Sequence, residues 1–151
     1  MTRTIQAVTQ LEPSDLAALL AASEAEGFRF VRRVAEEWAS GANRFAGPGE
    51  ALFVAIEQGR WVGICGLMRD PYAGLPNVGR LRNLYVLPAV RGRGIGADLT
   101  RAVITAAAGS FARLRLRTSG PQASRLYERL GFRPTRGEEG CTHALVPRSP
   151  L

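Results

Sequence analysis

Residues 91 to 97 combine arginine and glycine in a pattern that suits the binding of phosphate groups. The segment reads Arg91-Gly92-Arg93-Gly94-Ile95-Gly96-Ala97 and stands between an expected strand and an expected helix. The N-terminus of a helix presents unpaired N–H groups and the positive end of the helix dipole, and both attract anions. Glycine lets a ligand approach the backbone closely, and arginine adds donors of the right charge. We therefore predict a phosphate-binding loop here, against the alternative of a glycine-rich turn that only redirects the chain.

Two nucleotide-binding motifs resemble this loop, and their context argues against both. Gly92, Gly94 and Ala97 satisfy the letters of the dinucleotide fingerprint G-x-G-x-x-A. The match lies in the middle of the chain, however, and no acid stands near residue 117, where the ribose would need one. The phosphate loop of NTPases requires a lysine after its glycines, and this chain contains no lysine. The sequence therefore favours a phosphorylated ligand of another class.

The elements expected around the loop are typical of a mixed sheet with helices on both faces. Strands are expected at 4–8, 51–56, 61–68, 79–87, 111–118 and 142–146, with a further short strand near Arg133. Helices are expected at 13–20, 31–38, 95–108 and 122–130. The strand–helix–strand segment in the middle predicts a parallel pair of strands, and the turn at 57–60 predicts an antiparallel hairpin. The length favours a single domain over residues 1–151.

Two sequence motifs together resemble the GNAT superfamily of N-acetyltransferases. The pyrophosphate motif of that family, Q/R-x-x-G-x-G/A, is matched by Arg91, Gly94 and Gly96. About 30 residues later, the segment from Ala123 to Phe132, Ala-Ser-Arg-Leu-Tyr-Glu-Arg-Leu-Gly-Phe, resembles the second signature, A-x-x-L-Y-E-K-L-G-F. The resemblance implies the α/β GNAT fold: one twisted mixed sheet of six or seven strands, flanked by four helices, with a splayed pair of parallel strands.

The resemblance also implies an acyltransferase that moves the acetyl group of acetyl-CoA, its cosubstrate, directly to an amine in a ternary complex. Main-chain amides between Arg91 and Gly96, with Ala97 next to them, would hold the pyrophosphate. Tyr85 and Val86 would bind the pantetheine arm through backbone groups, and an N–H near Val86 would stabilise the oxyanion. Tyr127 would be the general acid that protonates the departing thiolate. On helical periodicity alone, Tyr127 would instead be a core aromatic.

The sequence departs from the family pattern at two points. Gly120 stands where many members carry an asparagine, although Ser119 beside it offers a polar group. Relatives often place a glutamate as general base on the strand that ends near Val86, and this strand carries no acid. The base is therefore either water or a residue from elsewhere, for which Asp70, Glu138 and Glu139 are candidates.

The acceptor amine is expected to bind near the two-helix region around Glu26 to Arg33 and near the loop at 70–77. Phe28, Phe30, Tyr72 and Asn83 are candidates to line this site, or else belong to the core and to loops. Arg113, Arg115 and Arg117 share one face of their strand; the alternatives are salt bridges or solvent contact. The sharper hypothesis is that Arg117 faces the cleft and selects an acceptor that carries a carboxylate or phosphate.

Composition limits the remaining classes. All 20 basic residues are arginine, the net charge is +7 and the pI is about 10.9. The second hypothesis is therefore a non-catalytic module that binds CoA or nucleic acid. Against nucleic acid, no aromatic residues alternate with the arginines of the strand at 111–118 to stack on bases.

His143 is the only histidine, and we expect no metal site. Cys65 and Cys141 lack CxxC spacing, which fits a reducing compartment. Without an apolar leader or membrane span, we expect a cytoplasmic location and no membrane partner. An exposed edge strand would allow a homodimer.

Overall fold

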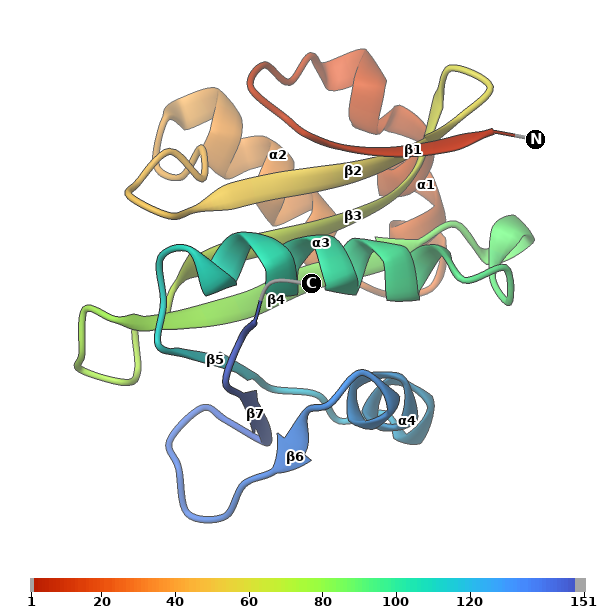
Figure 1. Ribbon diagram of the computed structural model, residues 1–151. Helices are drawn as coiled ribbons and strands as arrows, with labels where there is room; N and C mark the ends of the chain where they lie inside the picture. Colours follow the sequence, from red (N-terminus) through yellow and green to blue (C-terminus); the bar gives the residue numbers. More distant parts are fainter. Residues whose placement is uncertain (1, 149–151) are drawn as a thin grey trace.

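The backbone forms one seven-stranded mixed sheet, shown in Figure 1, with the strand order β1-β2-β3-β4-β5-β7-β6. The computed structural model describes residues 2–148; the ends of the expected domain, residues 1 and 149–151, lie outside them. The strands are β1 (Arg3–Ala7), β2 (Ala51–Glu57), β3 (Arg60–Arg69), β4 (Val78–Val86), β5 (Arg113–Leu116), β6 (Arg133–Pro134) and β7 (His143–Leu145). Only β4 and β5 are parallel among the pairs of the described residues, which confirms the predicted crossover.

Helices cover both faces of the sheet (Figure 1). Helices α1 (Ala17–Ala25) and α2 (Phe30–Ser40) pack behind it, and α3 (Ile95–Ala108) crosses its front. Helix α4 (Pro121–Arg129) follows β5, and two short 3-10 turns, Pro13–Leu16 and Pro88–Val90, precede α1 and α3. No helix among residues 2–148 has the length and apolarity needed to cross a bilayer.

The observed elements agree with the predicted order, including the short seventh strand at Arg133. The hairpin between β2 and β3 turns at Gln58 and Gly59, whose φ values of 51° and 75° are those of a type I′ turn. Side chains from both faces fill the core, for example Leu19 and Val31 from the helices behind and Leu99 and Val103 from α3. The mixed sheet with helices on both faces, expected from the sequence, is thus confirmed.

Strand β4 contains a bulge that separates it from β5. Asn83 has a φ of 63°, and the register with β3 shifts by one residue between Ile64 and Gly66. Asparagine is among the few non-glycine residues that adopt this left-handed conformation readily. The pairing of β4 with β5 ends at Arg80 and Arg115, before the bulge. Beyond that point the second edge of β4 has no neighbouring strand within the described chain.

A buried carboxylate holds the other end of β4 and β5 together. Asp70 is 2% exposed and lies 3.5 Å from Nη1 of Arg80 and 3.4 Å from Nε of Arg115. The contact with Arg115 is an ion pair without hydrogen-bond geometry. Asp70 Oδ1 also accepts hydrogen bonds from the N–H groups of Tyr72 and Ala73, at 2.7 and 3.1 Å. This cluster ties the loop at 70–77 to both parallel strands.

We expect Asp70→Ala to lower the free energy of unfolding by about 3–5 kcal/mol, because it leaves two arginines without their buried counter-charge. Glu24→Ala is the matched control, since Glu24 pairs with Arg32 on the surface and such exposed pairs contribute little to stability. Urea denaturation followed by circular dichroism measures both. Equal losses for the two variants would show that the buried cluster does not stabilise the fold.

Candidate functional site

The backbone at the start of α3 forms a cradle of unpaired donors. Within residues 2–148, the N–H groups of Gly92 to Ala97 make no hydrogen bond to any backbone acceptor, and the first helical bond is donated by Asp98 to Gly94, at 3.0 Å. Gly92 and Gly94 have φ values of 83° and 85°, which favour glycine. These unpaired amides at a helix N-terminus suit an anion such as a diphosphate.

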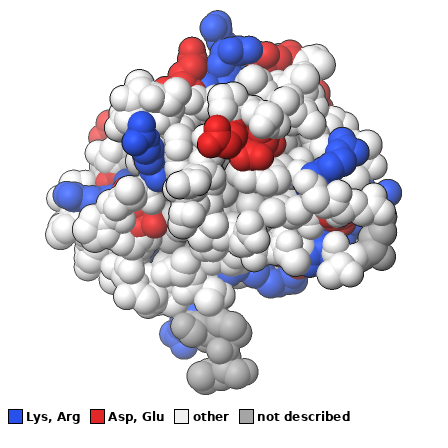
Figure 2. All heavy atoms as spheres, turned by 90° about the horizontal axis from the view of Figure 1, so that it is seen from above, with Lys and Arg blue, Asp and Glu red and all other residues white. Residues whose placement is uncertain are grey.

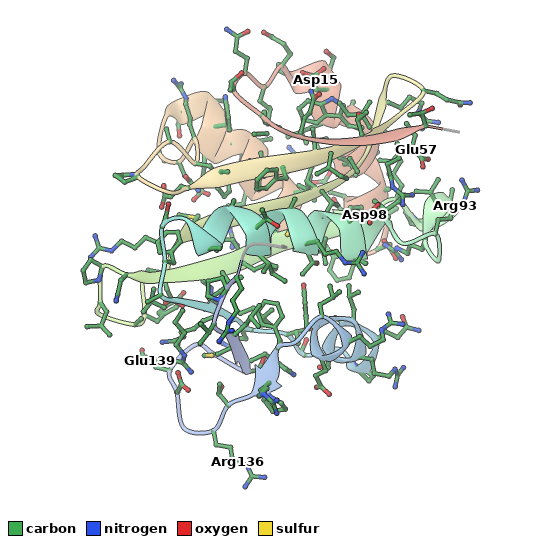
Figure 3. The ribbon with its side chains drawn as sticks, viewed as in Figure 1. Asp15, Glu57, Arg93, Asp98, Arg136 and Glu139 are labelled. Carbon is green, nitrogen blue, oxygen red and sulfur yellow. The ribbon has the colours of Figure 1, made fainter. Side chains whose placement is uncertain are left out.

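Space beside the cradle is kept open by small residues. A Cβ on Gly92 would contact nothing within 4 Å, and a Cβ on Gly96 would lie 3.4 Å from Leu126 Cδ2 and 3.9 Å from Val86 Cγ2. Gly96 therefore stands where α3, α4 and β4 meet. Arg93 points away from the body of the protein, whereas Asp98 turns toward β1 and binds Arg3 through two hydrogen bonds of 2.7 and 3.0 Å (Figure 3).

The free edge of β4 leads from the cradle into the interior. Leu87 donates to Val62 at 2.9 Å, and Tyr85 stands opposite Ile64, so these residues use their backbone groups on the β3 side. Backbone groups alternate along a strand, and the N–H and C=O of Val86 therefore point to the edge that β5 has left. Such an edge can accept an extended ligand as a further strand.

Tyr127 lies in the core beside this edge. It is 6% exposed and packs edge-to-face on Phe132, with ring centroids 5.7 Å apart. Burial raises the pKa of Tyr127 well above its ordinary value, and the nearby Cys65 adds to the shift. The phenol therefore stays protonated at neutral pH. Its burial agrees with the core aromatic that periodicity alone predicted, and the acid role that the motif implies stays a prediction.

Aromatic side chains cover the opposite face of β4 at its open end. Phe28 and Phe30 lie 6.3 and 5.9 Å from the ring of Tyr85, centroid to centroid, and Phe28 is 44% exposed. Burial and the adjacent Glu26 raise the pKa of Tyr85 to about 12. These rings form an apolar wall next to the backbone of Val86.

Glu26 joins this wall to the cradle. Its Oε1 accepts hydrogen bonds from Tyr85 Oη and Arg91 Nη2, both at 2.6 Å, and its Oε2 accepts one from Arg91 Nη1 at 3.0 Å. Arg91 Nε also donates to the carbonyl of Val86 at 3.0 Å. Hydrogen bonds from Arg91 first, and from Tyr85 second, lower the pKa of Glu26. The guanidinium of Arg91 is thus engaged by protein groups, and the cradle consists of amides.

The other predicted acceptor residues are spread over both ends of β4 and β5. Tyr72 is 52% exposed and lies under the guanidinium of Arg80, 5.0 Å away, at the closed end of β4. Asn83 forms the bulge and so shapes the site through its backbone. Arg117 follows β5 at the open end and is exposed.

Most of the arginine face of β5 is occupied by salt bridges, as the structural alternative proposed. Arg113 forms two hydrogen bonds of 2.6 and 2.8 Å with Glu138, and Arg115 donates to the carbonyl of Glu139. Glu139 lies at the far side of the molecule from Arg93 (Figure 3). The candidate bases Asp70, Glu138 and Glu139 therefore cluster around Arg80, Arg113 and Arg115, at the closed end.

His143 and Cys141 have local partners. Nε2 of His143 lies 2.9 Å from Glu128 on α4, and Nδ1 lies 2.9 Å from Oγ1 of Thr142. Cys141 donates its thiol to the carbonyl of His143 at 3.3 Å. Among the described residues, His, Cys, Asp and Glu form no group of three or more that could hold a metal ion.

The sequence analysis placed Glu26 in the region expected to border the acceptor site but gave its side chain no role. The signal was Gly27, since a glycine after a helix predicts a left-handed cap that fixes the residues around it. Charge alone would not have found it, because acidic and basic side chains alternate over the surface. The face in Figure 2 shows separate small groups of both signs and no continuous basic area that would suit a nucleic acid.

Comparison with known proteins shows the family to which this chain belongs. Residues 48–134 match the family model for the acetyltransferase (GNAT) domain. The chain is 34% identical over 102 residues to the uncharacterized N-acetyltransferase YjgM of Escherichia coli K12; the match covers 65% of this chain and 60% of that protein. The chain therefore spans less than two thirds of that relative.

Solved structures with the same fold support this family assignment. A crystal structure of an acetyltransferase candidate from Exiguobacterium sp. 255-15 is 34% identical, with a TM-score of 0.84 over 97% of this chain and 94% of the other. A GNAT family acetyltransferase from Brucella melitensis in complex with acetyl-CoA shares the fold at 21% identity, with a TM-score of 0.70 over 99% of this chain and 91% of that one.

Proposed function

The chain belongs to the GNAT acetyltransferase family, and from this premise we propose that it transfers the acetyl group of acetyl-CoA to an amine by direct attack in a ternary complex. The observation that carries the proposal is the cradle of unpaired amides from Gly92 to Ala97 beside the free edge of β4. An anionic diphosphate fits the amides, and an arm that contains peptide-like groups fits the edge. Acetyl-CoA has both parts, and the Brucella melitensis relative of the same fold binds it.

In this proposal the chain contributes binding and charge stabilisation. The amides of residues 92 to 97 hold the diphosphate, and the backbone of Val86 aligns the pantetheine arm, whereas the backbone of Tyr85 is paired with β3. When bound, acetyl-CoA supplies an activated thioester. The N–H of Val86 stabilises negative charge on the carbonyl oxygen. Tyr127 donates its proton or a hydrogen bond to the departing sulfur, for which a phenol that stays protonated is suited.

The acceptor amine is proposed to bind on the other face of β4. Phe28 offers exposed apolar surface there, and Arg117 offers a charge at the open end of β5. This combination favours an amine that also bears a carboxylate or phosphate, in a small molecule or a peptide. Arg113 is paired with Glu138 and is therefore not available to bind such an anion.

Calorimetric titration tests the cofactor. We expect acetyl-CoA to bind with a Kd of roughly micromolar size and NAD not to bind. Gly96→Val should weaken acetyl-CoA binding by about tenfold or more, because the branched side chain fills the space beside Val86 and Leu126. Gly109→Val, at the other end of α3, is the control for helix propensity and should bind normally. Tight binding by Gly96→Val would remove the cradle from the proposal.

Tyr127→Phe tests the acid. We expect kcat for thiol release from acetyl-CoA to fall roughly 10- to 10⁴-fold, while the Kd for acetyl-CoA and the melting temperature stay close to wild type, because only an oxygen atom is removed. An unchanged kcat would exclude Tyr127 from the chemistry.

A screen of amines tests the acceptor. Amino acids and acidic amines should be acetylated better than polyamines or aminoglycosides, and Arg117→Gln should raise the KM for an acidic amine by about tenfold, the size of one charge-assisted hydrogen bond. Arg136→Gln removes an equally exposed arginine elsewhere and is the control. A preference for polyamines would contradict the role of Arg117.

A further inference from the structure

The proposed function, on which this inference rests, lacks a group that takes the proton from the amine. The three acids considered from the sequence are committed elsewhere. Asp70 is buried between Arg80 and Arg115, Glu138 is bound to Arg113, and the backbone of Glu139 binds Arg115. All of them lie where β4 and β5 are still paired. The reacting groups would lie at the other end, beside Val86.

Glu26 is the acid that lies at this open end. Its carboxylate is bonded to Tyr85, the residue next to Val86, and sits on the acceptor face with the aromatic wall. The side chain is 32% exposed, so a ligand in the acceptor site can reach it. No acid of β4 itself occupies that place.

The turn that carries Glu26 is rigidly closed. Glu26 caps α1, and Gly27 follows with a φ of 86°. Phe28 donates to the carbonyl of Ser23 at 2.9 Å and Gly27 donates to Glu24 at 3.0 Å, which is the Schellman arrangement. Ser23 is fully buried. The Cα of Glu26 is therefore held in place, while its side chain reaches out to solvent.

The partner of Glu26 also belongs to the phosphate loop. Arg91 immediately precedes the amides of the cradle, and its side chain is 45% exposed. Ion pairs of such exposure are weak because water screens both charges. A bound diphosphate would present a stronger anion to the same guanidinium, since arginine binds phosphate oxygens bidentately. Arg91 thus stands between two anions and cannot serve both fully.

We propose that Arg91 leaves Glu26 for the diphosphate of bound acetyl-CoA, and that the freed carboxylate of Glu26 then receives the acceptor amine and its proton. Glu26 is in this sense a catalytic residue, and the acceptor site becomes anionic only after the cofactor is in place. Tyr85 keeps its hydrogen bond to Oε1 and orients the carboxylate.

The proton balance is complete. An acceptor that arrives as an ammonium ion first passes one proton through Glu26 to water, which leaves a neutral amine. The amine nitrogen then forms a bond to the carbonyl carbon as the carbon–sulfur bond breaks. Glu26 takes the second proton from the nitrogen, and Tyr127 supplies one to the sulfur. Exchange with water afterwards restores both side chains, so no other reactant is needed.

The direction of the pKa shift of Glu26 agrees with the proposed exchange. The hydrogen bonds from Arg91 are the largest cause that lowers the pKa of Glu26. Removal of Arg91 therefore raises the pKa toward the ordinary range and makes the carboxylate a better base. Tyr85 and Arg91 are the ionisable groups that contribute to this shift, and Tyr85 remains as a neutral donor.

The decisive experiment combines cofactor binding with turnover in Glu26→Gln. The amide keeps an oxygen for Tyr85 but no longer attracts Arg91. We expect acetyl-CoA to bind about three- to tenfold more tightly, because Arg91 is free for the diphosphate, while kcat/KM for the amine falls by about 10²- to 10⁴-fold. Glu24→Gln, two residues earlier in the same turn, changes an equally exposed glutamate paired with Arg32 and should alter neither quantity. Unchanged or weaker cofactor binding by Glu26→Gln would overturn the exchange.

Arg91→Gln gives an independent result. It should weaken acetyl-CoA binding by about tenfold while leaving the KM for the amine unchanged or lower, because Glu26 is then always free. Arg101→Gln, on an exposed turn of α3, is the control. A higher KM for the amine would show that Arg91 supports the acceptor site and would refute the proposal. If the wild-type protein neither binds acetyl-CoA nor releases thiol, it is the proposed function that fails.

Discussion

Beyond Arg80, strand β4 is paired with another strand along one edge only, and the rest of the site depends on this constraint. Backbone N–H and C=O groups inside a protein need partners, and a free strand edge next to a free helix N-terminus concentrates two sets of unsatisfied groups in one place. The two sets meet where Gly96 approaches Val86. A ligand that satisfies both sets must carry an anion at one end and amide groups along its length. This requirement limits the possible ligands far more than the fold class does.

The separation of the strands is confined because their other end is closed. Asp70 neutralises arginines from both strands there, and Asn83 supplies the bulge at which the pairing stops. The same residue types thus have different roles by position. Arginines on β5 with carboxylate partners stabilise the sheet, and Arg117, two residues after Arg115, is exposed to solvent.

Sequence reasoning predicted the parts of this arrangement that local chemistry determines. The loop at 91–97, the crossover and the hairpin follow from glycine, periodicity and chain reversal. The position of Asn83 was visible, but its bulge depends on the register with β3, which no local pattern encodes. The contacts of Glu26 were still harder to predict from the sequence. Its partners Tyr85 and Arg91 are 59 and 65 residues away in sequence, so only the folded chain brings the three together.

The two kinds of carboxylate–arginine contact explain why one acid can act and the other cannot. Asp70 is almost fully buried, and removal of either partner would leave an uncompensated charge in the interior, so its contacts must persist. Glu26 and Arg91 are partly exposed, and water compensates each of them when they separate, so their contact can be exchanged at little cost. A proton acceptor has to change its charge state during turnover. The exposed pair of Glu26 and Arg91 at the open end meets that requirement because it can separate. The buried contacts of Asp70 at the closed end hold β4 and β5 in the geometry that the site needs.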